Sequence, residues 1–263
     1  MGSHALSSLH SCLYVPTLPP HSAGMSSDSL PAEAIPSWSL EALQGRLAEL
    51  SCGAASAVLS LTFRLVLEAQ LRGESVCWVT RRESCFFPPD AAASGVDLEA
   101  LAVVRVPEVR LAPRAADTLV RSGGFGLVVL DLGSQNHSVG RSDVFAGGAA
   151  KVRGGQQLPL AVQTRLSGLA HKHHVALLFL TDKTSGSPSL GSLISLHVEA
   201  VRVEEAVAVK TTAEAAAAAV KTESAGVSGD GRRFECRVHV LKDKRQGMGW
   251  QHREAFRGPT GLC

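Results

Sequence analysis

A short segment near residue 50 has the pattern at which many proteins bind phosphate. Residues 47–61, LAELSCGAASAVLSL, predict an apolar strand, a Gly/Ala/Ser turn and a helix. A loop of the form G-x-x-x-x-G-K-[ST] uses glycines to let backbone N–H groups wrap the phosphates, a lysine to neutralise them and a hydroxyl to hold Mg²⁺. In the two possible reading frames, the lysine position holds Val58 or Leu59. Taken alone, the segment therefore predicts an ordinary strand–helix turn.

A second candidate is the carboxylate that ends a very apolar strand. Residues 125–132, FGLVVLDL, place Asp131 at the end of a predicted buried strand. An acidic residue there fits the Walker B position, which holds Mg²⁺ through water. The alternative is that Asp131 accepts hydrogen bonds from nearby backbone N–H groups. The strand alone does not decide between the two.

Two further segments carry side chains that could bind ligands. The glycine-rich stretch 141–157 contains Arg141, Lys151 and Arg153, which could contact phosphates or belong to a solvated connector. The HKHH run at 171–174 has no carboxylate or cysteine placed to complete a metal shell. We expect a solvated helix end there, and no metal site. No G-x-S-x-G motif supports a hydrolase.

Composition excludes several classes of protein. The 263 residues carry a formal net charge of +2 and only 5% aromatic residues, which argues against a globally polybasic protein and against a base-stacking surface. None of the 6 cysteines forms a C-x-x-C pair, so we expect reduced thiols of a cytoplasmic protein. No stretch approaches the roughly 20 apolar residues of a membrane span.

The elements that position these residues begin after residue 36. The Ser-, Pro- and His-rich residues 1–36 predict a disordered tail. A short amphipathic helix follows, with Ser39 as its N-cap. Such a helix could pack on its own domain or dock a partner, and its apolar residues are Trp38, Leu40, Leu43 and Leu47.

Strands and helices then alternate along the chain. We expect strands at 47–51, 74–80, 101–106, 125–132 and 175–182, and helices at 55–72, 112–123 and 158–174. This order predicts βαβ units and a parallel sheet. Further strands at 192–209, 232–245 and 249–258 alternate like antiparallel ones. The predicted fold is α/β, three-layered, with a mainly parallel sheet extended by C-terminal antiparallel strands.

The same pattern predicts the domain organisation. We expect one domain over residues 37–258, interrupted by a low-complexity insertion at 210–231 and followed by a tail at 259–263. The alanine-rich insertion has no apolar periodicity of its own. It is therefore predicted to leave the domain surface between two strands.

Five segments, taken in order, resemble the core of the RecA recombinase family. SGVDLEALAVVRV resembles the stretch after the catalytic-glutamate strand, and AADTLVRSGGFGLVVLDLGS the helix and Walker B strand. QTRLSGLAHKHHVALLFLTD resembles the elements before the sensor position and the second DNA-binding loop. GSLISLHVEAVRVE and VHVLKDKR resemble the next strand and the Lys-x-Lys strand. The resemblance covers roughly residues 45–257 and implies a RecA-like core.

The departures from that family are concentrated at the nucleotide site. The Walker A lysine and hydroxyl are absent, and an arginine near residues 80–83 stands where the family has its catalytic glutamate. Asp182 replaces a sensor glutamine, and the second DNA-binding loop is reduced to 183–190. We therefore expect no ATPase activity and no cofactor. The degenerate nucleotide site would comprise Gly53, Ser56, Ala57, Val58 and Asp131.

A degenerate RecA-like chain of this length resembles the ImuA family of bacterial SOS-mutagenesis accessory proteins, which are sometimes grouped with the inhibitor SulA. This resemblance implies a non-catalytic cytoplasmic protein, nucleoid-associated when it acts, that works in translesion DNA synthesis. It implies binding to the RecA recombinase and to ImuB, a Y-family-like polymerase homologue, together with an error-prone replicative-type polymerase. DNA contact would be weak or indirect.

Other functions stay open at this stage. They are a SulA-like inhibitor of the division GTPase, a single-stranded DNA-binding module and an NTPase with a cryptic loop. In the RecA family the Lys-x-Lys pair reaches across a subunit boundary to ATP. The candidate contacts with DNA or a partner are Arg141, Lys151, Arg153, Lys183, Lys242 and Lys244.

Overall fold

The computed structural model describes residues 37–52, 57–82, 84, 86–133, 157–183, 186–204 and 233–257. The predicted tails at 1–36 and 259–263 and the predicted insertion at 210–231 lie outside these residues. Those three boundaries stay predictions.

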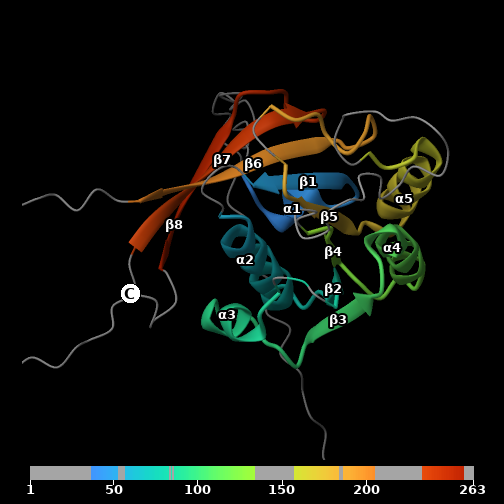
Figure 1. The fold of residues 1–263 in the computed structure, drawn as a ribbon, viewed down its shortest axis with the longest axis horizontal. Coiled ribbons are helices and arrows are strands. Elements are labelled where there is room, and N and C mark those ends of the chain that lie inside the picture. The colour runs from blue at the N-terminus through green and yellow to red at the C-terminus, as the bar shows by residue number, and fades with distance from the viewer. Residues whose placement is uncertain are drawn as a thin grey trace, which may run out of the picture. The chain divides into compact units, whose positions relative to one another are not determined.

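The described strands form one sheet in the order β3-β2-β4-β5-β1-β6-β7-β8 (Figure 1). Every pair from β3 to β6 is parallel, whereas β7 pairs antiparallel with both β6 and β8. The predicted fold class is therefore confirmed. The strands are β1 Leu47–Cys52, β2 Val76–Arg81, β3 Leu101–Val106, β4 Leu127–Asp131, β5 Ala176–Thr181, β6 Leu196–Glu204, β7 Arg233–Asp243 and β8 Gln251–Arg257.

Helices cover both faces of the parallel strands. Figure 1 shows α2 and α3 on one side of these strands and α4 and α5 on the other. The helices are α1 Leu40–Leu43, α2 Val58–Leu71, α3 Pro88–Ala93, α4 Ala112–Arg121 and α5 Leu160–His173, with a 3₁₀ turn at Val109–Leu111. In the described part of the chain, none of them is long and apolar enough to cross a membrane.

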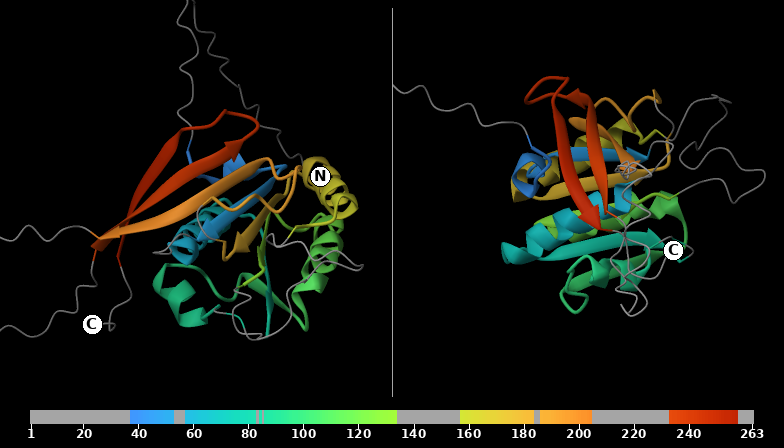
Figure 2. Two further views of the ribbon diagram at one scale, coloured as in Figure 1. Left: turned by 45° about the horizontal axis from the view of Figure 1, so that its top comes forward. Right: turned by 90° about the vertical axis from the view of Figure 1, so that its left-hand side faces the viewer.

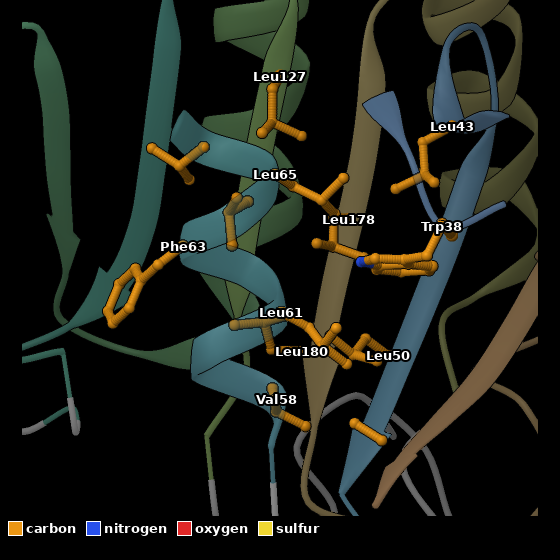
Figure 3. Packing of buried hydrophobic residues seen from close by; sticks show 14 of the residues in the cluster. Trp38, Leu43, Leu50, Val58, Leu61, Phe63, Leu65, Leu127, Leu178 and Leu180 are labelled. Carbon is orange, nitrogen blue, oxygen red and sulfur yellow. The ribbon is translucent and has the colours of Figure 1, made fainter. Parts of the chain in front are cut away.

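Two apolar clusters, one on each face, hold these layers together. On the first face, Figure 3 shows Trp38, Leu50, Leu61 and Leu178 in one group between α2 and the strands. On the other face, the strands pack against α4 and α5. Side chains alternate between the faces along each strand, so β1 sends Leu50 to the first cluster and Leu47 to the second.

The N-terminal helix corrects one prediction. Ser39 is its N-cap, as expected, and its hydroxyl accepts a hydrogen bond from the Ala42 N–H at 3.3 Å. The helix has only four residues, however, and Leu47 already belongs to β1. Of the two interpretations, packing on its own domain is the one that the structure matches, and the partner-docking one is wrong. All of its apolar side chains are buried in the domain itself: Trp38, Leu40, Leu43 and Leu47.

One helix was not predicted at all. The six residues of α3 begin at Pro88 and bury only Ala91. Such a short helix with one buried residue shows no apolar periodicity over two turns, which is the signal that sequence patterns rely on.

Candidate functional site

The carboxyl ends of four neighbouring parallel strands form the candidate site. The strands lie in the order β2-β4-β5-β1, and they end at Arg81, Asp131, Thr181 and Cys52. In open α/β sheets, ligands bind outside the carboxyl ends of the strands, where the direction of the connections reverses. The fold therefore places the degenerate loop and the Walker B carboxylate at one edge of the sheet.

Asp131 is held inside the protein by two hydrogen bonds. The residue is only 4% exposed. The Thr80 hydroxyl donates to Oδ2 at 2.8 Å, and the Gly133 N–H donates to Oδ1 at 3.0 Å. Burial raises the pKa of Asp131, and these two hydrogen bonds and the charge of Arg81 only partly oppose that rise. Both oxygens accept hydrogen bonds within the protein, and the one from the Gly133 N–H is of the backbone-capping kind.

An arginine lies beside this carboxylate. Arg81 ends β2, and its positive charge lowers the pKa of Asp131. Its Nη2 atom is 3.6 Å from the position that a Cβ on Gly133 would take. Gly133 has φ of 63°, so a side chain there would also strain the backbone. A cation thus occupies the edge where the RecA resemblance places a catalytic glutamate.

The start of α2 is apolar and packed. Ala57 precedes the helix without a capping side chain, and Ala57 and Val58 are 2% and 7% exposed. Both belong to the cluster on the α2 face, and Leu59 packs against it. The Thr62 hydroxyl donates to the Val58 carbonyl at 2.7 Å. The described part of the loop therefore carries methyl groups and no phosphate-binding side chain.

Five other predicted site residues lie outside the described part of the chain. Gly53 and Ser56 of the degenerate loop belong to the undescribed residues 53–56. The basic residues Arg141, Lys151 and Arg153 fall in the undescribed stretch 134–156. Their roles stay predictions.

The ends of β1 and β5 meet through a thiol and a carboxylate. The Cys52 Sγ donates to Asp182 Oδ1 at 2.8 Å. Asp182 is the residue expected to replace the sensor glutamine. The structure therefore brings together the entrance of the degenerate loop and the predicted sensor position.

The prediction that Lys183 contacts DNA or a partner is wrong, because the residue is buried. The residue is 8% exposed, and its Nζ lies 2.8 Å from Glu49 Oε1. It also donates to the Pro188 carbonyl at 2.8 Å. A buried ammonium paired in this way cannot reach a phosphate without breaking an ion pair whose remaining carboxylate would be left in the interior.

Glu49 is the centre of a buried polar cluster that the sequence analysis missed. It is 0% exposed on β1 and accepts hydrogen bonds from the Thr181 hydroxyl at 3.0 Å and the Leu190 N–H at 2.6 Å. His197 on β6 lies 3.9 Å away, and burial lowers its pKa, which favours the neutral ring. A glutamate inside the apolar strand LAELSC was the available signal, since a buried acid requires partners.

Side chains of α5 and β7 hydrogen-bond the backbone of Ser192 and Leu193, which precede β6. Gln163 donates to the Leu158 carbonyl at 2.6 Å and accepts from the Leu193 N–H at 2.9 Å. From β7, Lys242 and Lys244 donate to the Ser192 carbonyl at 3.3 and 2.7 Å. Burial and the neighbouring Lys244 charge lower the pKa of Lys242. Within this chain the Lys-x-Lys pair therefore binds backbone carbonyls, and its cross-subunit role stays a prediction.

Comparison with known proteins points to the same family as the sequence segments. No family model matches the chain. RecA of Herpetosiphon aurantiacus is 29% identical over 204 residues, which cover 68% of this chain and 56% of that protein. RecA of Fusobacterium nucleatum is 34% identical over 88 residues, which cover 34% of this chain and 23% of that protein. The matches thus span a quarter to about half of these relatives.

Comparison with solved structures also gives a RecA-like fold. The crystal structure of the RadB recombinase superposes with a TM-score of 0.50 and 14% identity, over 82% of this chain and 88% of that one. The chain is thus distantly similar to RecA proteins, and its fold is RecA-like. Its RecA-like fold carries, at the carboxyl edge, a buried Asp131 with Arg81 beside it.

Proposed function

We propose that this RecA-like chain is a non-catalytic accessory protein of error-prone translesion DNA synthesis in the SOS response. It binds the RecA recombinase and the ImuB component of a mutasome, and it modulates or inhibits RecA filaments. The observation that supports this proposal is the set of side chains at the ends of β2 and β4 and at the start of α2, where the RecA resemblance places the nucleotide. There Asp131 is buried and hydrogen-bonded, Arg81 faces it, and α2 begins with packed methyl groups.

The chemistry of phosphoryl transfer explains why such an edge favours a non-catalytic role. Catalysis rests on cations that neutralise the transferred phosphoryl group and on a residue that positions the attacking water. Val58 and Leu59 offer no cation at the loop, and Arg81 cannot accept a proton from water at neutral pH. Retaining the scaffold without these groups favours a role for its surfaces.

A mechanism for RecA modulation follows from the shared fold. A subunit with RecA-like faces can dock on a RecA protomer at the end of a filament. It cannot complete an ATP site at that interface, so the next protomer is not added with nucleotide bound. Substoichiometric amounts would then be enough to cap filament ends or to suppress nucleation.

The test is a binding and strand-exchange experiment with partners from the same source. The full chain is immobilised and challenged separately with RecA, ImuB and the division GTPase. We expect capture of RecA and ImuB but not of the GTPase, and inhibition of RecA-driven strand exchange below one chain per RecA protomer. Capture of the division GTPase alone would favour the SulA-like function. Failure to bind any of the three, together with tight ATP binding, would refute the proposal.

A further inference from the structure

The Glu49 cluster contains a histidine whose Nε2 atom is buried and unpaired. His197 belongs to β6, which Figure 2 shows between β1 and β7. The register of the parallel pair sets His197 directly opposite Glu49 of β1. The residue is 4% exposed, and its Nε2 has no hydrogen-bond partner among the described residues. A buried polar atom without a partner is costly, so a proton gained here must find an acceptor nearby.

The nearest carboxylate, that of Glu49, already accepts from several donors. Its Oε1 accepts from the Thr181 hydroxyl at 3.0 Å and pairs with Lys183 Nζ at 2.8 Å. Its Oε2 accepts from the Leu190 N–H at 2.6 Å. His197 Nε2 lies 3.9 Å from Oε1, which is about 1 Å longer than a charge-assisted hydrogen bond. A small movement of the ring would therefore bring a third donor to Oε1 and crowd the two that are there.

Of the two donors on Oε1, Lys183 is the one that can leave. Thr181 ends β5 and is paired in the sheet with Ser51 of β1. Lys183 follows the end of that strand, and its long side chain also donates to the Pro188 carbonyl at 2.8 Å. Moving Thr181 would disturb the pairing of β5 with β1. Moving the Lys183 side chain would break only its ion pair and its hydrogen bond to Pro188.

Protonation of His197 supplies the replacement for that cation. Removing Lys183 alone would leave the Glu49 carboxylate buried without a positive partner, which is strongly destabilising. A protonated imidazole beside Oε1 keeps one positive charge against the carboxylate, so the lysine can turn to solvent. The neutral ring cannot do this, because it carries no charge to balance Glu49.

The charged groups around His197 determine when it takes up a proton. They are Glu49 of β1, Lys183 after β5, Lys242 of β7 and Glu199, which is two residues further along β6. Burial lowers the pKa of His197, and the two lysines lower it further, whereas the two glutamates raise it. Departure of Lys183 removes a repelling charge and so returns the pKa of His197 toward its ordinary value of 6.5. Release of the lysine and uptake of the proton therefore favour each other.

We propose that these residues form a pH-sensitive switch, in which a proton on His197 displaces Lys183 from Glu49. At neutral pH the lysine is paired in the interior. At acid pH the imidazolium lies beside the carboxylate, and the lysine turns to solvent at the carboxyl end of β5. Residues 186–189 then lose one hydrogen bond to the interior, at the Pro188 carbonyl. The switch goes beyond the proposed function and holds whether or not the chain binds RecA or ImuB.

The change is confined to a short segment, because residues 190–195 have other anchors. Leu190 is buried in the second apolar cluster, and its carbonyl accepts from the Leu158 N–H at 2.8 Å. Gln163 accepts from the Leu193 N–H at 2.9 Å. We therefore expect the fold to stay intact when the lysine is released.

Brief acetylation of the full chain tests whether Lys183 leaves the interior. Its labelling is divided by that of Lys172, which is exposed on α5, so that the common effect of pH on amine reactivity cancels. Since release takes up one proton, this ratio should rise by up to about tenfold per pH unit as pH falls below about 6.5. A ratio that stays level down to about pH 5, well below the ordinary histidine pKa, would overturn the proposal.

Two glutamine variants provide the matched comparison. His197→Gln cannot take up the proton, so its labelling ratio should stay level over the same range. His239→Gln removes an exposed histidine of the neighbouring strand β7 and should keep the profile of the wild type. A rise that survives in His197→Gln, or that is lost in His239→Gln, would contradict the switch.

Nuclear magnetic resonance of the wild type keeps the test decisive if His197→Gln does not fold. The His197 ring and the Leu190 N–H both lie against Glu49, so their resonances should shift with one common midpoint below about pH 6.5. Separate midpoints for the two signals, or a ring that does not titrate above about pH 5, would overturn the proposal.

Discussion

Asp131 is the residue at which the two interpretations of the site differ most. As a Mg²⁺-binding carboxylate it would need oxygens open to solvent. In the structure its oxygens accept from Thr80 and Gly133, and burial raises its pKa. We therefore expect the residue to act as a structural acceptor that joins the ends of β2 and β4.

Substitution of Asp131 separates these roles. Asp131→Asn keeps an acceptor and buries no charge, so we expect the free energy of unfolding at pH 7 to stay equal or to rise. Asp131→Ala leaves the Thr80 hydroxyl and the Gly133 N–H unpaired and should cost about 1–3 kcal/mol. Urea denaturation measures both. A wild-type protein that Mg-ATP stabilises, with that stabilisation absent in Asp131→Asn, would show instead that the carboxylate holds metal.

The difference in stability between the wild type and Asp131→Asn should depend on pH with a definite sign. Since the folded state raises the pKa of Asp131 above its ordinary value of 3.8, folded protein keeps a proton that unfolded protein has already lost. Stability due to this group is therefore present below about pH 4 and is lost as pH rises through the folded pKa. The free energy of unfolding of the wild type minus that of Asp131→Asn should therefore fall as pH rises across that window. A difference that rises with pH would contradict the burial argument.

The buried ion pair between Asp243 and Arg46 gives the opposite dependence of stability on pH. Asp243 Oδ1 lies 2.7 Å from Arg46 Nη2, with both side chains at most 3% exposed. Burial alone would raise the pKa of Asp243, but hydrogen bonds from the Arg245 N–H and from Arg46 lower it overall. Stability from this carboxylate is thus present above about pH 4 and is lost as pH falls through the folded pKa.

Removing that carboxylate should be strongly destabilising. Asp243→Ala leaves the Arg46 guanidinium buried without its partner, and we expect a loss of about 3–5 kcal/mol at pH 7. The loss should shrink toward acid pH in urea denaturation series. The control Glu99→Ala removes an exposed carboxylate and should change stability by less than about 0.5 kcal/mol. An equal effect of the two substitutions would show that Arg46 does not depend on Asp243.

At the scale of elements, α1 is part of the core, which is one of the two roles that its amphipathic sequence allowed. Leu43 is 0% exposed, and Figure 3 shows it near Trp38 beside the strands. Leu43→Ala should lower the free energy of unfolding by about 2–5 kcal/mol. Glu41→Ala, on the exposed side of the same helix, should change it by less than about 0.5 kcal/mol.

The two substitutions in α1 also test the earlier hypothesis directly. A docking helix would show weaker capture of RecA or ImuB in Leu43→Ala with an unchanged denaturation midpoint. A core helix shows the reverse, with a lower midpoint and normal capture by the protein that remains folded. Measuring both quantities on the same preparations distinguishes the two.

For the molecule as a whole, regular apolar runs made most elements predictable. The run LAVVRV gave β3 with its observed bounds, and Gly123 and Gly124 marked the end of α4 within two residues. Long helices such as α5 were found because they keep their apolar spacing over several turns. Order along the chain then sufficed to predict a mainly parallel sheet.

What could not be predicted depends on contacts between distant positions. Lys183 looked like a surface cation because nothing near it in sequence shows Glu49, which is 134 residues earlier and adjacent only after β1 pairs with β5. The proximity of His197 and Glu49 likewise needs the register of β1 and β6, which sets the two residues opposite each other. Amphipathic spacing in α1 could not distinguish burial in its own domain from burial against a partner.

The central claim is that a RecA-like scaffold persists here without phosphate chemistry, and ATP turnover tests it most directly. Phosphate release by the purified full chain is measured with Mg²⁺ and ATP, with and without single-stranded DNA, beside Asp131→Ala. The account predicts release indistinguishable from a protein-free control in every case. Turnover above that control by the wild type that disappears in Asp131→Ala would contradict it.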